Sequence, residues 1–151
     1  MPTQATYDDA NLILRLYELR REEKLRKARE WFSANFTPTS LEDAQRLAPM
    51  GSQESAYMRM VVSYWEMAAS LVTSGVLNQE LFFQSAGELL FVWERVRTLV
   101  PAQREFTKNP HYWGNLETVG NAFIKWMDAR SPEAYPHLQK MVHGAAGPKQ
   151  G

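Results

Sequence analysis

The chain has 151 residues, with 17 lysines and arginines against 17 aspartates and glutamates, 44% hydrophobic residues and no cysteine. This length and composition are typical of a single globular domain with its own core, and the lack of cysteine excludes disulfides, thiolate metal sites and a thiol nucleophile. The balanced charge argues against a dedicated nucleic-acid-binding protein, because such proteins neutralise phosphates with an excess of basic side chains.

The first predicted helix covers residues 8–34. Asp8 or Asp9 is expected to cap its first amide groups. The front half of this helix has a broad apolar face, and the charged segment 20–29 follows it. The face consists of Leu12, Ile13, Leu14, Leu16, Tyr17 and Leu19.

A short helix is predicted next. The residues Thr39-Ser40-Leu41-Glu42 have the pattern of a capping box, in which a hydroxyl and a carboxylate each bind a free backbone amide. This helix is expected to end at Ala48, before Pro49.

The predicted helix over residues 53–73 is apolar around most of its circumference, so it is expected to be the central helix of the domain. A turn with Gly75 and a cap at Asn78 lead to another predicted helix over residues 79–99, which Pro101 is expected to end. The connection is short, so these two helices are expected to pack as an antiparallel hairpin.

A fifth main helix is predicted over residues 111–129. Gly114 and Gly120 each weaken a helix by about 1 kcal/mol relative to alanine, so they are expected where helices approach closely. Ser131 and Pro132 are typical of the start of a last short helix.

Residues 144–151 lack large apolar groups, so they are expected to form a disordered tail after a folded domain of residues 1–143. No strand-like alternation is present. The pattern therefore predicts a single all-α bundle of about five main helices.

Large aromatic side chains provide the candidate core and interface residues. Trp65, Trp93 and Trp126 are expected to be core anchors. Phe91 lies on the polar side of its predicted helix, where a large ring is typical of an interface, so we expect self-association as a homodimer. The alternative is that such rings cover the core beneath loops.

Two carboxylates that follow tryptophans, Glu66 and Glu94, are the candidate chemical groups. If both point into one pocket between helices, with Arg59 and Arg97 beside them, burial raises their pKa and makes them candidates for acid–base catalysis or ligand binding. In the alternative interpretation, each carboxylate pairs with an arginine or caps a backbone group at the edge of the core.

Other chemical motifs are missing from the sequence. It contains no nucleotide-binding glycine motif, no serine nucleophile elbow and no Glu-x-x-His pair, and His111, His137 and His143 lack the spacing of a helical metal site. We therefore predict no catalytic residue, no cofactor and no metal.

The segment 20–29 carries six lysines and arginines, against three glutamates up to Glu30. A surplus of this kind can contact phosphates or an anionic membrane surface, but interleaved glutamates are more typical of a solvated helix with internal ion pairs. Nucleic acid is therefore not the expected partner.

One part of the chain resembles a large bacterial family of all-helical domains of unknown function. The resemblance rests on Trp65-Glu66-x-x-Ala69, Gly75-Val76-Leu77-Asn78, Gly87, Trp93-Glu94 and the upstream segment Ala28-Arg29-Glu30-Trp31-Phe32, within residues 20–125. It implies a packed pair of helices joined by a turn, and it implies no catalytic residues.

The sequence has no uninterrupted apolar run of 18 residues and no signal-peptide pattern at residues 1–9, so we expect a cytoplasmic protein without a transmembrane segment. The leading hypothesis is a non-catalytic protein-interaction or regulatory module. The alternatives are an enzyme that uses Glu66 and Glu94, and weak binding of anions or nucleic acid by residues 20–29.

Overall fold

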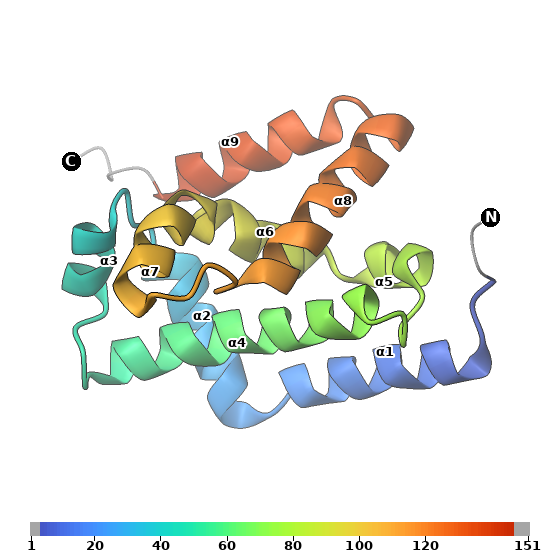
Figure 1. Ribbon diagram of the computed structural model, residues 1–151, viewed down its shortest axis with the longest axis horizontal. Coiled ribbons are helices and arrows are strands. Elements are labelled where there is room, and N and C mark those ends of the chain that lie inside the picture. Colours follow the sequence, from blue (N-terminus) through green and yellow to red (C-terminus); the bar gives the residue numbers. More distant parts are fainter. Residues whose placement is uncertain (1–3, 147–151) are drawn as a thin grey trace.

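A computed structural model describes residues 4–146, which form nine α-helices and one short 3-10 helix and contain no strand (Figure 1). The helices are α1 (Tyr7–Arg20), α2 (Glu23–Asn35), α3 (Leu41–Leu47), α4 (Gln53–Thr73), α5 (Gln79–Ser85), α6 (Gly87–Val96), the 3-10 helix η1 (Arg97–Leu99), α7 (Val100–Thr107), α8 (Gly114–Arg130) and α9 (Ala134–Ala146). The predicted all-α class is confirmed for these residues. The predicted number of about five main helices is lower than this, in part because two of the predicted helices are divided.

The last helix extends further than the sequence pattern predicts. Helix α9 runs to Ala146 and therefore includes the first three residues of the predicted tail. The rest of that tail, residues 147–151, lies outside the described residues.

Helix α1 begins with a capping box built on Thr6. The Thr6 hydroxyl accepts a hydrogen bond from the backbone N–H of Asp9, whose carboxylate in turn accepts one from the Thr6 N–H. Asp9, one of the two predicted caps, is instead buried, and its carboxylate also accepts the backbone N–H of Asn78 at 2.8 Å. These backbone hydrogen bonds from Thr6 and Asn78 lower the pKa of Asp9. The same carboxylate thus joins the start of α1 to the start of α5.

The predicted helix over residues 8–34 is divided at Glu22. This residue has an extended backbone, with φ −60° and ψ 139°, and its carboxylate accepts the N–H of Leu25 as the cap of α2. The bend allows α1 to lie along α4 while α2 crosses it (Figure 1), so that Leu16 and Phe32 both reach the core. Favourable i,i+4 charge pairs stabilise a straight helix by only about 0.2–0.5 kcal/mol each. This is less than the free energy gained when the bend buries both apolar side chains.

The predicted capping box of Thr39 and Glu42 does not form before α3. Ser40 is the cap, because its hydroxyl accepts the N–H of Asp43, and the Asp43 carboxylate accepts the N–H of Thr39. The carboxylate at the start of this helix therefore belongs to Asp43 and not to Glu42, and it binds the residue before the cap rather than the cap itself.

The predicted helix over residues 79–99 is also divided. Ala86 leaves the helical region with φ −109° and ψ 33°, and it is followed by Gly87, a poor helix former. Pro101 does not end a helix; it lies in the first turn of α7, where an amide has no acceptor within the helix and a proline costs nothing.

Helix α6, and not α4, is the most enclosed helix. Seven of the ten residues of α6 are buried, against seven of the 21 residues of α4. The bounds of α4 agree with the predicted 53–73, but its largest contacts are with α2 and α8, and its contact with α6 is smaller. Helix α6 is enclosed by α4, α8 and α9.

Helices α6 and α8 approach closely at Gly120. A Cβ atom added there would lie 2.6 Å from Cδ1 of Trp93. The same addition at Gly114 would meet nothing within 4 Å. The predicted close contact is therefore confirmed at Gly120 and wrong at Gly114.

We expect Gly120→Ala to lower the free energy of unfolding by about 1–3 kcal/mol, because the buried Trp93 ring has to move to admit the methyl group. Gly114→Ala is the matched control in the same helix, and it should raise stability by about 0.5–1 kcal/mol through helix propensity alone. Urea denaturation of both variants provides the measurement. Equal shifts in the same direction would contradict the close contact.

Candidate functional site

Glu66 caps a helix other than its own. It is half-buried on α4, and its carboxylate accepts hydrogen bonds from the side-chain amide of Asn115 at 2.7 Å and the backbone N–H of Leu116 at 2.9 Å. Helix α8 begins after Trp113, which has a left-handed backbone and provides no side-chain cap. Glu66 therefore accepts a backbone N–H in the first turn of α8 that has no acceptor within that helix. A negative charge is favourable at this end of a helix.

Glu94 is a buried carboxylate that holds α9 on α6. Its oxygens accept hydrogen bonds from Tyr135 at 2.6 Å, Arg97 at 3.2 Å and Gln139 at 3.3 Å, and His143 lies 3.3 Å away. Burial raises the pKa of Glu94, but the hydrogen bonds from Tyr135 and Gln139 and the charge of Arg97 outweigh it, so the pKa is lowered. Burial and the adjacent Glu94 raise the pKa of Tyr135 to about 12. The carboxylate is therefore ionised at neutral pH.

The four sequence-predicted pocket residues divide between two separate places. Glu66 and Glu94 share no hydrogen-bond partner among residues 4–146, since one binds the start of α8 and the other binds α9. Arg97 forms an ion pair with Glu94, whereas Arg59 is exposed. The charge of Arg59 lowers the pKa of Tyr112, and burial raises it. A general acid at neutral pH needs a raised pKa, and Glu94 has a lowered one.

Within residues 4–146, no group of three histidine, aspartate or glutamate side chains is placed to hold a metal ion. No helix in this range combines the length and apolar character needed to cross a bilayer.

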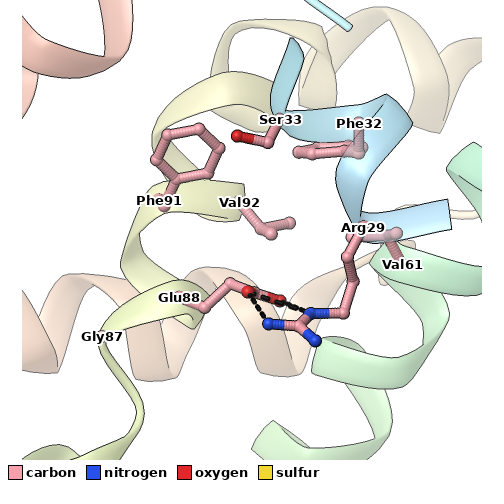
Figure 2. Close-up of a pocket in the computed structure, with 8 residues that line it drawn as sticks. All are labelled: Arg29, Phe32, Ser33, Val61, Gly87, Glu88, Phe91 and Val92. Atoms are coloured by element: carbon pink, nitrogen blue, oxygen red, sulfur yellow. Dashed lines mark hydrogen bonds and ion pairs between the residues drawn. The ribbon is translucent and has the colours of Figure 1, made fainter. Parts of the chain in front are cut away.

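A cavity of about 290 Å³ lies between α2, α4 and α6 (Figure 2). We call it the α2–α6 cavity. Its lining residues are Arg29, Phe32, Ser33, Val61, Gly87, Glu88, Phe91 and Val92. Figure 2 shows the pair Arg29 and Glu88 at one end of the cavity, with Ser33 and Phe91 at the other. The walls are therefore mainly apolar, and one end is charged.

The charged end is a hydrogen-bonded group of three side chains. Arg29 donates to both oxygens of Glu88, through Nη2 at 2.7 Å and through Nε at 2.9 and 3.0 Å. The indole Nε1 of Trp65 donates to the same carboxylate at 3.0 Å, and Nη1 of Arg29 donates to the carbonyl of Arg20 at 3.2 Å. The hydrogen bond to Glu88 raises the pKa of Arg29. Arg29 and Glu88 are 59 positions apart, so no local pattern could have predicted the pair.

Behind the wall of the cavity lies a buried cation, Arg95, which is only 4% exposed. Its Nη atoms donate to the carbonyls of Phe32, Ser33 and Phe36 at 2.8–3.1 Å, and so satisfy the end of α2. Its guanidinium lies 4.5 Å from the centre of the Phe91 ring. No carboxylate of residues 4–146 forms an ion pair with it, its Nε has no hydrogen-bond partner there, and burial lowers its pKa to about 10.

The sequence-predicted aromatic residues have three different environments. Trp65 and Trp93 are buried, and Trp126 is half-buried, with its indole N–H donating to Glu80. Phe91, the predicted interface residue, is half-buried between the α2–α6 cavity and Arg95. Much of its ring is therefore in contact with its own chain.

Helix α1 carries exposed large apolar side chains on one face. Tyr7 is 92% exposed, Leu14 60% and Tyr17 50%, and Ala10 lies between them on the same face. Of the broad apolar face of this helix, Leu16 lies in the core, and Leu12 and Ile13 pack against it. The sequence signal for this outer face is the spacing of three, four and three residues between positions 7, 10, 14 and 17.

The fold and these contacts define a class of protein: an all-helical domain whose helices are held by buried rings and by carboxylates that bind other helices. The chain belongs to the family described as a domain of unknown function (DUF4760), which matches residues 5–126. The resemblance to a family of uncharacterised domains is thereby confirmed. No curated protein and no solved structure matches the chain.

Proposed function

We propose that this domain is a non-catalytic interaction module that self-associates through the outer face of α1. The observation that carries the proposal is a stripe on one face of α1 that consists of the exposed Tyr7, Leu14 and Tyr17 and the half-buried Ala10. A contiguous apolar stripe of this kind on the surface is typical of a protein-interaction site. A cytoplasmic setting is part of the proposal, since a chain without cysteine suits a reducing compartment.

The spacing of the stripe favours a helix as its partner. Positions 7, 10, 14 and 17 follow the alternating three- and four-residue steps of a coiled-coil seam, which place side chains in line for packing against a second helix. Helix α1 has 14 residues, so a paired helix would contact it over about 21 Å.

A second copy of α1 in antiparallel orientation completes this seam. With a two-fold axis between the copies, Tyr7 of one copy faces Tyr17 of the other, and Ala10 faces Leu14. Each layer then combines either two rings or a small with a large side chain. A parallel pair would place Ala10 against Ala10 and leave a gap, so the antiparallel arrangement fills the interface better.

The association should be weak. A standard interface buries about 800 Å² per partner, and a seam of four side chains on a 14-residue helix contributes less. We expect a monomer–dimer equilibrium with a dissociation constant that is roughly micromolar or higher.

Leu14→Glu should abolish the dimer, because the two-fold axis places the new charge in an apolar layer on both copies. The measurement is sedimentation velocity of the full chain over a range of concentrations. Stability should change by no more than about 0.5 kcal/mol, since Leu14 is mainly exposed.

Phe106→Glu is the matched control, because Phe106 is 58% exposed and lies on α7. It should leave the dimer intact. A wild-type chain that stays monomeric at high concentration would overturn the proposal. So would a Leu14→Glu variant that dimerises like the wild type.

A further inference from the structure

The α2–α6 cavity has the size and lining of a small-ligand site. Its volume of about 290 Å³ is at the lower end of ligand pockets and corresponds to on the order of ten water-sized groups. Phe32, Val61, Phe91 and Val92 provide apolar walls (Figure 2). A ligand that fills it therefore needs a compact apolar body.

The charged end of the cavity has hydrogen-bond donors to spare and few free acceptors. Glu88 accepts three contacts from Arg29 and one from Trp65, and a carboxylate has about four acceptor sites. Arg29 uses Nε, one N–H of Nη2 and one N–H of Nη1, so two of its five N–H groups have no partner among the described residues. The Ser33 hydroxyl also has no hydrogen-bond partner there. This end can therefore bind an acceptor more readily than a donor.

The electrostatic environment is positive. Arg95 lies behind Phe91 as a buried cation without a carboxylate partner among residues 4–146. A second hollow continues from the first one, since both are lined by Arg29, Ser33 and Glu88. It adds Arg26, Lys27 and Glu30. Positive charges therefore outnumber negative charges around the two hollows. The apolar wall has a low dielectric constant, which strengthens the attraction between these charges and a bound anion.

From these features we infer that the α2–α6 cavity binds a small organic anion with an apolar body and one carboxylate group. The apolar body lies against Phe32, Phe91 and Val92, and the carboxylate accepts the free N–H groups of Arg29. Charge-assisted hydrogen bonds to a guanidinium are about twice as strong as neutral ones, so the charge should dominate the choice of ligand. This inference uses different residues from the α1 face and does not depend on self-association.

The test compares two probes of nearly the same shape, 2-naphthoate and the neutral 2-naphthamide. Isothermal titration calorimetry of the full chain at low salt should show naphthoate binding at least about tenfold tighter than the amide, a difference of ~1.4 kcal/mol. Equal affinities, or no binding of naphthoate at millimolar concentration, would overturn the inference.

Ser33→Phe tests the location of the probe. Ser33 is exposed and lines the cavity, so a phenyl ring there should fill the cavity and abolish binding without loss of the fold. Ala34→Phe is the matched control, because Ala34 is the next exposed residue of α2 and does not line the cavity. Naphthoate binding that survives Ser33→Phe would place the site elsewhere and overturn the inference.

The double variant Arg29→Met/Glu88→Gln tests the role of the charge. It removes both charges together, so no unpaired charge remains, and the glutamine oxygen still accepts the N–H of Trp65. Most of the preference for naphthoate over the amide should then be lost, while amide binding stays within about twofold. An unchanged tenfold preference would overturn the assigned role of Arg29, and a melting curve confirms that the variant is folded.

Discussion

Trp65→Ala is expected to lower the free energy of unfolding by about 3–5 kcal/mol, as for other large-to-small changes of a buried ring. The indole is fully enclosed and packs edge-on against Tyr64 at 5.0 Å. The guanidinium of Arg20 lies 5.2 Å from its centre, and its Nε1 holds the carboxylate of Glu88. The substitution therefore removes core volume and also one hydrogen bond of a partly buried ion pair. Urea denaturation followed by circular dichroism measures the loss.

Trp126→Ala provides the comparison for Trp65→Ala. Trp126 is half-buried, and its indole N–H binds the exposed Glu80, so truncation leaves a smaller cavity and no buried unpaired group. We expect a clearly smaller loss than for Trp65. Equal losses at the two positions would show that burial in this core does not determine stability.

Glu94→Ala is expected to lower the free energy of unfolding by about 2–3 kcal/mol, because it removes a buried carboxylate that accepts several hydrogen bonds. Tyr135 and Gln139 lose their acceptor, and α9 loses its principal polar contact with α6. Hydrogen exchange of the α9 amides should therefore increase more than that of the α4 amides. Uniform exchange would contradict the role of Glu94 as the anchor of α9.

The pH dependence of Glu94→Gln gives a second measurement of the same anchor. The pKa of Glu94 is lower in the folded chain than its ordinary value of 4.5, so the unfolded chain binds more protons between the two values. The stabilising contribution of Glu94 is present above pH 4.5 and is lost as the pH falls through the folded pKa. The stability difference between wild type and Glu94→Gln should therefore shrink as the pH falls below 4.5. A stability difference that stays constant over this pH range would contradict the role of Glu94 as the anchor of α9.

Local signals in the sequence were sufficient wherever the structure is locally determined. Helix α4 has the predicted bounds because Ser52 caps its start and Gly75, with φ +83°, forms the turn after its end. The cap at Asn78 follows from side-chain chemistry at a single position. Each of these features depends on a few neighbouring residues, so it can be predicted from a single sequence.

The divided helices show where local signals fail. A continuous apolar pattern suits a straight helix over residues 79–99 and equally suits a helix that bends at Ala86. The choice depends on what the second half packs against, and α6 needs the bend to enter the space between α4, α8 and α9. Glu94 and Arg95 are buried for the same reason, since they meet α9 and the end of α2 rather than solvent.

The sequence by itself determined the all-helical class, the extent of α4 and the family, because periodicity, caps and motif spacing are properties of short segments. Only the tertiary structure decided which apolar face of α1 is exposed, which carboxylates bind other helices, and that Arg29 meets Glu88 beside a cavity. These features arise from contacts between segments far apart in the chain. Their free energies depend on burial and on distance in space, and neither quantity is encoded at one position.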